Sequence, residues 1–234
     1  MMLKKLTLSS ALVLCMTILS STAWADNIPI VNASFETLGA PLSTPCGTGC
    51  AYNLGPIPGW TTTAGAGSWM PGSFFSAIPD GSLVGFVNAS NSLTQTLTGN
   101  SVLANSTYTM NVYVGDRTDN LNGTYTLSLD TILGGVTSTL CTFSGNASSI
   151  PHGTFQLEGC TYTSGASGLP DGDLFLKFTA TNGGQLDVDN VSLTVQSPTG
   201  VPEPSTILMV SIGMLLLGVS FLMTRKKVLS LTAQ

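Results

Sequence analysis

Short segments of alternating apolar and polar residues fill the middle of the chain, and turn-forming residues separate them. From Tyr108 to Val114 every second residue is apolar, and Leu174, Leu176 and Phe178 follow the same rule. Side chains two residues apart lie on the same face of a strand, so this alternation predicts strands that bury one face. The expected strands are Ser82–Val87, Ser92–Leu97, Thr107–Val114, Gly123–Ile132, Val136–Phe143, Gly153–Tyr162, Asp173–Thr179 and Gln185–Val195.

The composition of residues 26–200 also favours an all-β fold. This part of the chain is rich in Thr, Ser, Gly, Asn and Val, which form strands and turns. It is poor in Lys, Glu and Arg, which favour exposed helices. Short strands between frequent turns are typical of an antiparallel β-sandwich. The length suits a single extracytoplasmic domain with a sizeable core.

The N-terminus has the features of a secretory signal peptide. Two lysines near Met1 precede an apolar stretch, and Ala25 ends an Ala-Trp-Ala sequence that matches the small-residue pattern of a cleavage site. We therefore expect export through the Sec translocon, followed by removal of residues 1–25 by signal peptidase. The mature chain would begin at Asp26.

The other end of the chain combines three features without a spacer. Pro202-Glu203-Pro204 predicts a rigid, extended entry, because proline fixes φ and disfavours a helix before it. An uncharged apolar run of 17 residues follows, Ile207–Met223, which at about 1.5 Å per residue spans about 26 Å, near the minimum for a bilayer. We expect a transmembrane helix over 206–224. Arg225-Lys226-Lys227 then marks the cytoplasmic end of the helix, which leaves 228–234 as a cytoplasmic tail.

This order of features resembles the PEP-CTERM sorting signal of Gram-negative bacteria, over residues 201–227. The resemblance implies that exosortase, a membrane transpeptidase-like cysteine enzyme, cuts the chain near the Pro-Glu-Pro motif. It also implies an inner-membrane intermediate, and then a place at the cell surface or in the extracellular matrix, in the context of biofilm and exopolysaccharide. An ordinary membrane anchor is the alternative, although such an anchor does not require Pro-Glu-Pro at the membrane surface.

Four cysteines remain after export: Cys46, Cys50, Cys141 and Cys160. An even number in an exported chain predicts two disulfides, and four cysteines allow three connectivities. We favour Cys46–Cys50, within a Gly-Thr-Gly loop, and Cys141–Cys160, between neighbouring strands. Zinc bound by all four is the alternative, but zinc sites use two closely spaced pairs, and Cys141 and Cys160 are far apart.

Five short motifs run in a fixed order through the expected domain: Asn32–Glu36, Ile57–Trp60, Ser92–Leu97, Ala104–Thr109 and Leu186–Leu193. Their order resembles the galactose-binding-domain-like jelly rolls, the fold of many carbohydrate-binding modules. The resemblance implies that the first and last motifs lie side by side and hold a structural calcium ion, with Glu36 and Asp189 as ligands. Asp187 shares a strand face with Asp189, and their repulsion also favours a cation there. In the alternative, Asp189 accepts hydrogen bonds from backbone amides and Glu36 is exposed.

The charge of residues 26–200 limits the partners of the domain. This part of the chain contains two basic residues, Arg117 and Lys177, and eleven acidic residues, which gives a net charge of −9. Phosphate binding requires Lys and Arg, so we expect no contact with nucleic acid. An acidic surface suits neutral sugars or divalent cations, and it equally keeps an exported protein soluble.

Three residues are candidates for ligand binding. Trp60 and Trp69 lie in Gly-rich sequence, and aromatic rings stack on the apolar faces of sugars. Arg117 is the third candidate, with pairing to Asp116 or Asp119 as its structural alternative. Together with the two resemblances, these residues lead us to expect a surface or matrix protein that contacts extracellular polysaccharide.

The sequence predicts no catalytic site, and we expect that the protein is not an enzyme. It contains no nucleophile elbow, phosphate-binding loop, Rossmann glycines or HExxH zinc motif. His152 is the single histidine; it follows a proline in a turn and is most simply a surface residue. The alternative is a secreted glycoside hydrolase or another hydrolase, because glycosidases need only two suitably placed carboxylates.

Overall fold

The computed structural model describes residues 25–119, 121, 123–166, 171–197, 210–214 and 216–218. All named strands belong to one compact unit that ends at Ser197. Residues 210–214 and 216–218 belong to a second unit and are helical. Within the described residues, no helix is long and apolar enough to cross a membrane.

The expected targeting segments fall largely outside the described residues. These include residues 1–24 of the expected signal peptide, Pro202-Glu203-Pro204, Arg225-Lys226-Lys227 and the tail 228–234. Ala25, the expected last residue of the signal peptide, is described and pairs with Gln196. Export, sorting and the membrane-spanning helix therefore stay predictions.

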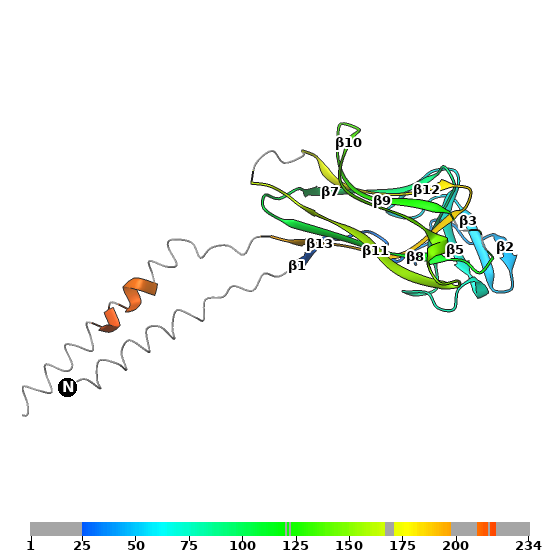
Figure 1. The fold of residues 1–234 in the computed structure, drawn as a ribbon, viewed down its shortest axis with the longest axis horizontal. Helices are drawn as coiled ribbons and strands as arrows, with labels where there is room; N and C mark the ends of the chain where they lie inside the picture. Colours follow the sequence, from blue (N-terminus) through cyan, green and yellow to red (C-terminus); the bar gives the residue numbers. More distant parts are fainter. Residues whose placement is uncertain are drawn as a thin grey trace, which may run out of the picture. The chain divides into compact units, whose positions relative to one another are not determined.

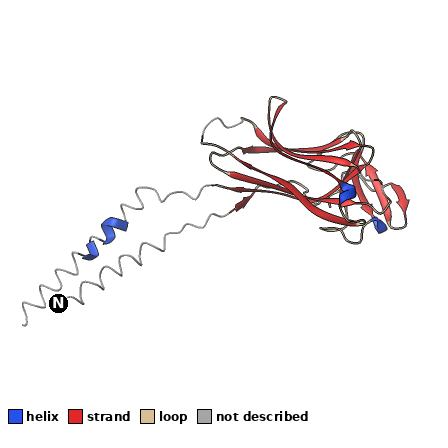
Figure 2. Cartoon of the chain, viewed as in Figure 1, coloured by secondary structure: helices blue, strands red, loops and turns tan. Residues whose placement is uncertain are grey.

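The described strands form two antiparallel sheets, drawn as two layers of arrows in Figures 1 and 2. The strands are β1 (Ala25–Asn27), β2 (Thr44–Gly47), β3 (Cys50–Leu54), β4 (Thr61–Thr62), β5 (Ala66–Pro71), β6 (Val84–Asn88), β7 (Ser92–Ser101), β8 (Thr107–Asp116), β9 (Thr124–Leu133), β10 (Val136–Asn146), β11 (Thr154–Thr163), β12 (Asp173–Asn182) and β13 (Gln185–Gln196). The larger sheet runs β11-β8-β13-β6-β5-β3-β2, with β1 paired to β13, and the smaller sheet runs β10-β9-β12-β7-β4. The expected all-β antiparallel sandwich is confirmed.

All eight strands expected from the alternating pattern are present as β6 to β13. The pattern did not predict β1 to β5. These strands have two to six residues, and β2 and β5 contain Gly and Pro. So few residues cannot establish an alternating period, and the local pattern therefore carries little signal for them.

The main core lies between the two sheets. The even-numbered residues of β8 from Tyr108 to Val114 are buried, as are Leu174, Leu176 and Phe178 of β12. Trp60 packs within this core, with its ring 5.4 Å from Phe35 and 5.5 Å from Phe178.

Both favoured disulfides are present. Cys46–Cys50 closes the hairpin of β2 and β3, with Cα atoms 5.1 Å apart. Cys141–Cys160 joins β10 to β11, with Cα atoms 5.9 Å apart. These two strands are edge strands of different sheets, so the second disulfide ties the two layers together.

Candidate active site

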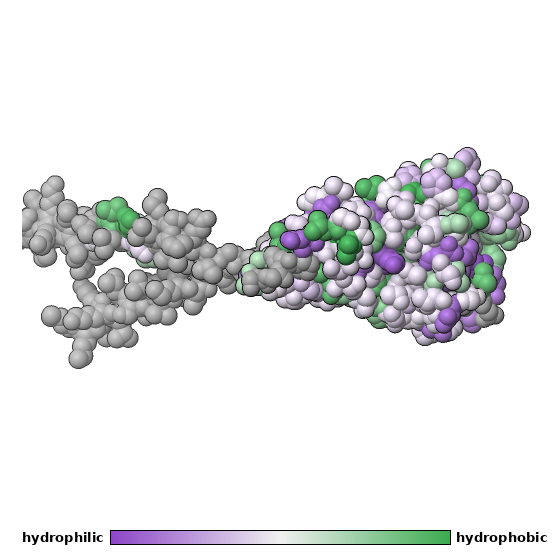
Figure 3. Space-filling model, turned by 90° about the horizontal axis from the view of Figure 1, so that it is seen from above, coloured by the Kyte–Doolittle hydropathy of each residue, from purple (hydrophilic) through white to green (hydrophobic). Residues whose placement is uncertain are grey.

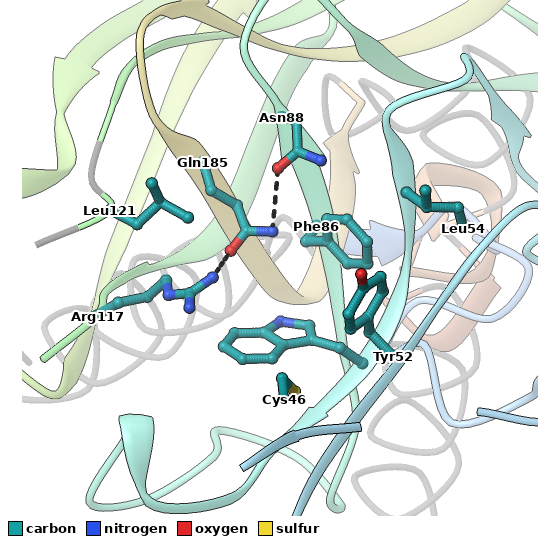
Figure 4. Close-up of a pocket in the computed structure, with 9 residues that line it drawn as sticks. Cys46, Tyr52, Leu54, Phe86, Asn88, Arg117, Leu121 and Gln185 are labelled. Atoms are coloured by element: carbon teal, nitrogen blue, oxygen red, sulfur yellow. Dashed lines mark hydrogen bonds between the residues drawn. The ribbon is translucent and has the colours of Figure 1, made fainter. Parts of the chain in front are cut away.

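A second, smaller apolar cluster lies on the outer face of the larger sheet. Its buried members are Cys50, Trp69, Phe75, Val84 and Phe86. Beside it is a cavity of about 260 Å³. The cavity is lined by Cys46, Tyr52, Leu54, Trp69, Phe86, Asn88, Arg117, Leu121 and Gln185 (Figure 4). We call this cavity the aromatic pocket.

Strand register brings the rings of the aromatic pocket together. Tyr52 of β3 pairs with Trp69 of β5, and the ring of Tyr52 meets that of Phe86 edge-on at 6.0 Å. Paired residues on neighbouring antiparallel strands present their side chains to the same face. Three strands far apart in sequence therefore supply one continuous aromatic wall, which Figure 4 shows around Tyr52 and Phe86.

Arg117 follows β8 and forms the polar side of the aromatic pocket. Its guanidinium is held by Asp119 through Nε and Nη2, which donate to the two carboxylate oxygens at 2.9 and 2.7 Å. Nη1 donates to Gln185 Oε1, and the amide of Gln185 donates to Asn88 Oδ1 at 3.3 Å, as drawn in Figure 4. The guanidinium also lies 4.5 Å from the centre of the Trp69 ring, a distance typical of a cation–π contact. The expected pairing of Arg117 with an aspartate is therefore confirmed for Asp119.

Asp187 is completely buried, and it pairs with a residue that lines the aromatic pocket without lining the pocket itself. On β13 it pairs with Phe86 on one side and with Gly115 on the other, so its side chain faces the same way as Phe86. The missing side chain at Gly115 leaves room for the ring of Phe75, whose atoms would lie 2.8 Å from an added Cβ. Neither carboxylate oxygen of Asp187 accepts a hydrogen bond of ordinary geometry.

Burial raises the pKa of Asp187 to about 8. The positive charge of Arg117 and the nearby indole N–H of Trp69 lower this pKa, whereas the negative charges of Asp119 and Asp116 raise it. Desolvation dominates because a charged carboxylate without hydrogen bonds is costly in an apolar environment. Burial therefore favours the neutral form of this carboxyl group, whose strand neighbour Phe86 lines the aromatic pocket.

The family of the chain follows from a comparison of sequences. The model of the HpiC1-like family, described as HpiC1 cyclase, matches residues 26–194. The chain belongs to the HpiC1-like family. A search of curated proteins finds no match.

Solved structures resemble the fold. An apo cyclase from Fischerella sp. has 24% identity and a TM-score of 0.58, over 75% of this chain and 98% of that one. A cyclase from Fischerella sp. TAU in complex with 4-(1H-indol-3-yl)butan-2-one has 21% identity and a TM-score of 0.58, over 74% of this chain and 100% of that one. The CBM22-1 xylan-binding domain of Xyn10C from Paenibacillus barcinonensis has 14% identity and a TM-score of 0.47, over 76% and 99% of the two chains.

Membership of the HpiC1-like family corrects one expectation from the sequence. We expected that the protein is not an enzyme. The HpiC1-like family is a family of cyclase description, so this expectation is wrong. The search for familiar catalytic motifs missed this because the residues around the aromatic pocket form no such motif, and its unusual acidic neighbour, Asp187, is a single aspartate. Its environment, and not a sequence motif, gives it an unusual proton affinity.

The structure separates the three residues expected to bind a ligand. Trp69 and Arg117 meet at the aromatic pocket. Trp60 does not reach it, because both neighbouring rings are core residues and only 6% of its surface is exposed. Trp60 is therefore a core residue and not a ligand platform. Trp69 itself lies on β5, a strand that the alternating pattern did not predict.

Glu36 and Asp189, the two residues expected to bind calcium, both accept hydrogen bonds from the backbone of residues 80–83. Glu36 Oε1 accepts hydrogen bonds from the backbone N–H groups of Ser82 and Leu83 at 2.8 and 2.7 Å. Asp189 Oδ2 accepts from the N–H of Asp80 at 2.9 Å, and its Oδ1 accepts from the N–H of Asn190 at 2.7 Å. Burial raises the pKa of Asp189 to about 7, partly offset by these two N–H groups, while the charges of Asp80 and Glu36 raise it further.

These contacts match the alternative reading for Asp189, in which backbone amides satisfy the carboxylate. Among the described residues, no group of three or more His, Cys, Asp or Glu side chains is arranged to hold a metal ion. Carboxylate oxygens have further lone pairs, so the donor set is still chemically suited to calcium. Calcium binding by Glu36 and Asp189 stays a prediction.

His152 is exposed, as expected, but it has a buried partner. Its Nδ1 lies 2.8 Å from Oδ2 of Asp116, whose side chain is completely buried at the end of β8. The backbone N–H of Gly153 donates to the carbonyl of Asp116 at 2.7 Å, which fixes the turn against the strand. His152 therefore packs against Asp116 at the end of β8. The sequence alone gave no reason to connect these two residues.

Proposed function

We propose that the protein is a cyclase whose substrate occupies the aromatic pocket and whose acid is Asp187. The observation that carries this proposal is a completely buried carboxyl group that accepts no hydrogen bond of ordinary geometry and is paired, across two strands, with Phe86 of the aromatic pocket. Membership of the HpiC1-like family gives the reaction class. A catalytic acid works best when its pKa lies near the operating pH, and burial brings Asp187 into that range.

The proposed reaction is an isomerisation that starts with proton transfer. Asp187 gives its proton to an unsaturated carbon of the substrate, and a second double bond or an electron-rich ring supplies the electron pair that closes the new ring. A proton then leaves the product and returns to the carboxylate, so the mass of the product equals that of the substrate. The faces of Trp69 and Phe86 stabilise the positive charge that develops during ring closure.

The aromatic pocket suits a mostly apolar, flat substrate with one or two polar atoms. Its volume of about 260 Å³ is near the lower end of the range for small-molecule sites. The amides of Asn88 and Gln185 provide polar contacts on one side. An indole-bearing ketone occupies the related cyclase from Fischerella sp. TAU, and we propose an indole-bearing substrate here as well.

Binding and turnover test this proposal separately. Calorimetry with 4-(1H-indol-3-yl)butan-2-one should show binding that is lost in Phe86→Ala and kept in the surface variant Asp171→Asn. Alkenyl indoles incubated with the protein in D2O should give a ring-closed product that carries one deuterium, and Asp187→Asn should abolish it. Binding without any product, or a product that forms equally well with Asp187→Asn, would refute the role given to Asp187.

We also propose that the chain is exported and sorted by exosortase. The support is the order of apolar and basic segments at both ends of the sequence, with Pro202-Glu203-Pro204 directly before the apolar run. Mass spectrometry of the protein recovered from the cell surface should show a C-terminus near residue 204. Recovery of the intact Gln234 terminus from surface material would contradict sorting.

Contact with extracellular polysaccharide is the second candidate function. On the outer face of the smaller sheet, the half-buried ring of Phe175 pairs with the exposed Thr96 on one neighbouring strand and with the buried Asp130 on the other. Figure 3 is seen from the side on which β7, β9 and β12 lie, and pale residues of intermediate hydropathy predominate there. The proposed galactose-binding-like jelly roll is the fold of many carbohydrate-binding modules, which is consistent with sugar binding at this face. Binding on a glycan array that is lost in Phe175→Ala would support this function, and no binding to any glycan would remove it.

A further inference from the structure

A row of hydrogen-bonded side chains runs along one side of the aromatic pocket. It begins at Asp119, whose carboxylate accepts from Nε and Nη2 of Arg117 at 2.9 and 2.7 Å. Nη1 of Arg117 donates to Oε1 of Gln185, and Nε2 of Gln185 donates to Oδ1 of Asn88 at 3.3 Å (Figure 4). From Arg117 to Asn88, every hydrogen bond is therefore donated in the same direction.

Strand pairing places the last two members of this row beside each other. Gln185 is the first residue of β13 and pairs with Asn88, the last residue of β6. Paired residues present their side chains to the same face, here the face that also carries Phe86. Gln185 is buried, Asn88 is half-buried, and both line the aromatic pocket. A ligand in the pocket would therefore lie against this row.

The guanidinium of Arg117 decides which way both amides point. An amide can present either its oxygen or its nitrogen to a neighbour, but a guanidinium carries only donors. The end of Gln185 that faces Arg117 must therefore be the oxygen, and this leaves the nitrogen to face Asn88. An amide nitrogen donates, so the end of Asn88 that faces Gln185 must also be the oxygen.

Asn88 consequently offers a hydrogen-bond donor to the pocket. Its oxygen is engaged by Gln185, and its nitrogen Nδ2 lies on the other side of the amide (Figure 4). Within the part of the chain that the structure describes, no side chain or carbonyl accepts from Nδ2. An N–H group in a mostly apolar wall favours a ligand atom that accepts a hydrogen bond.

We propose that Arg117 and Gln185 orient Asn88 as a hydrogen-bond donor, and that Asn88 selects ligands with an acceptor such as a carbonyl oxygen. Asn88 is then a specificity-determining residue, and Arg117 and Gln185 are positioning residues. The inference rests on the proposed function, which places an indole-bearing ligand in the aromatic pocket. It adds the polarity that this ligand has on the side of Asn88.

Three ligands that differ at one carbon of the side chain test this polarity. At that carbon, 4-(1H-indol-3-yl)butan-2-one carries only an acceptor, the corresponding alcohol carries an acceptor and a donor, and 3-butylindole carries neither. Calorimetry with the full-length protein gives the ratio of the affinities for the ketone and the alcohol. The affinity for 3-butylindole reports any change in the apolar part of the pocket.

Gln185→Glu reverses the polarity with almost no change in size. The glutamate accepts from Arg117 but cannot donate to Asn88, so the amide of Asn88 turns and donates to it instead. Oδ1 of Asn88 then faces the pocket, where it repels the ketone oxygen but accepts from the alcohol. A neutral hydrogen bond changes affinity by about 2- to 12-fold, and we expect the ketone-to-alcohol ratio to fall by this factor.

Asn88→Asp reaches the same reversal by a second route. One carboxylate oxygen still accepts from Gln185, while the other places an acceptor where Nδ2 was, so the ratio should again fall. Gln196→Glu makes the same substitution at the exposed other end of β13 and should leave the ratio unchanged. An unchanged ratio in either pocket variant, once circular dichroism shows that it is folded, would overturn the role of Asn88.

The outcomes separate this inference from the proposed function. If the ratio falls in the variants but no substrate is ever turned over, Asn88 sets the polarity of the pocket and only the cyclase proposal fails. If the ligands bind but the ratio does not move, the role of Asn88 is wrong and the indole-binding pocket stands. If none of the three ligands binds the wild type, the indole-bearing ligand is wrong, and the selection by Asn88 among such ligands is wrong with it.

Discussion

Replacing Asp187 by Asn should change how the stability of the protein depends on pH. The pKa of Asp187 is raised from 3.8 to about 8 in the folded state, because the carboxyl group is completely buried. Between these two values the folded protein keeps a proton that the unfolded chain releases. The folded state therefore loses stability as pH rises through this window, by at most about 1.4 kcal/mol per pH unit.

Across the whole window from pH 3.8 to about 8, the loss is on the order of 5 kcal/mol. The amide that replaces the carboxyl group in Asp187→Asn is neutral at every pH and has nearly the same shape, so this substitution should remove the loss. At pH 4 the variant and the wild type should have similar free energies of unfolding. At pH 8 to 9 the variant should be more stable.

Urea unfolding at half-unit steps from pH 4 to pH 9 measures both profiles. Asp189 also has a raised pKa, of about 7, and contributes to the slope of both proteins, so the difference between the two profiles isolates Asp187. Asp171→Asn serves as the control for the loss of one negative charge. Two parallel profiles would show that Asp187 is ionised in the folded protein, and the proposed acid would be lost with it.

Three further predictions concern the core, the disulfide between the sheets and calcium. Trp60→Ala should lower the free energy of unfolding by about 3 to 5 kcal/mol, because the ring fills the core between two aromatic neighbours; a loss below about 1 kcal/mol in urea unfolding would contradict its core position. Replacing Cys141 and Cys160 by Ser should cost about 3 kcal/mol, since the bridge closes a loop with a sequence separation of 19 residues; urea unfolding compared with the disulfide-bonded wild type tests this value. We propose that Glu36 and Asp189 bind calcium, so EDTA should lower the melting midpoint and added calcium should restore it, whereas an unchanged midpoint in a metal-free protein would remove the proposal.

The sequence determined the sandwich and the strands that build its core. Alternation in segments such as Thr107–Val114 and Asp173–Thr179 is a local property, and it needs no knowledge of the partner strand. It predicted all eight strands from β6 onwards. Cysteine number and spacing likewise suggested the pairing of Cys46 with Cys50, because the two residues are close in the chain and a tight turn brings them together.

Only the tertiary structure decided where the site lies. Two of the three strands in its aromatic wall, β3 and β5, are short and lack alternation, so no local pattern marked them as strands. The sequence likewise could not tell Trp60 from Trp69, because both follow Gly-rich segments, and only packing places the first in the core and the second at the pocket.

Asp187 was visible in the sequence as half of an Asp-Val-Asp pattern, but its chemistry was not. Its raised pKa depends on complete burial and on the charged groups around it. Burial and the position of a charge depend on residues far away along the chain, whereas strand alternation depends on immediate neighbours. For this reason the sequence by itself determined the scaffold, and the folded structure alone turned one of the eleven acidic residues in 26–200 into a candidate acid.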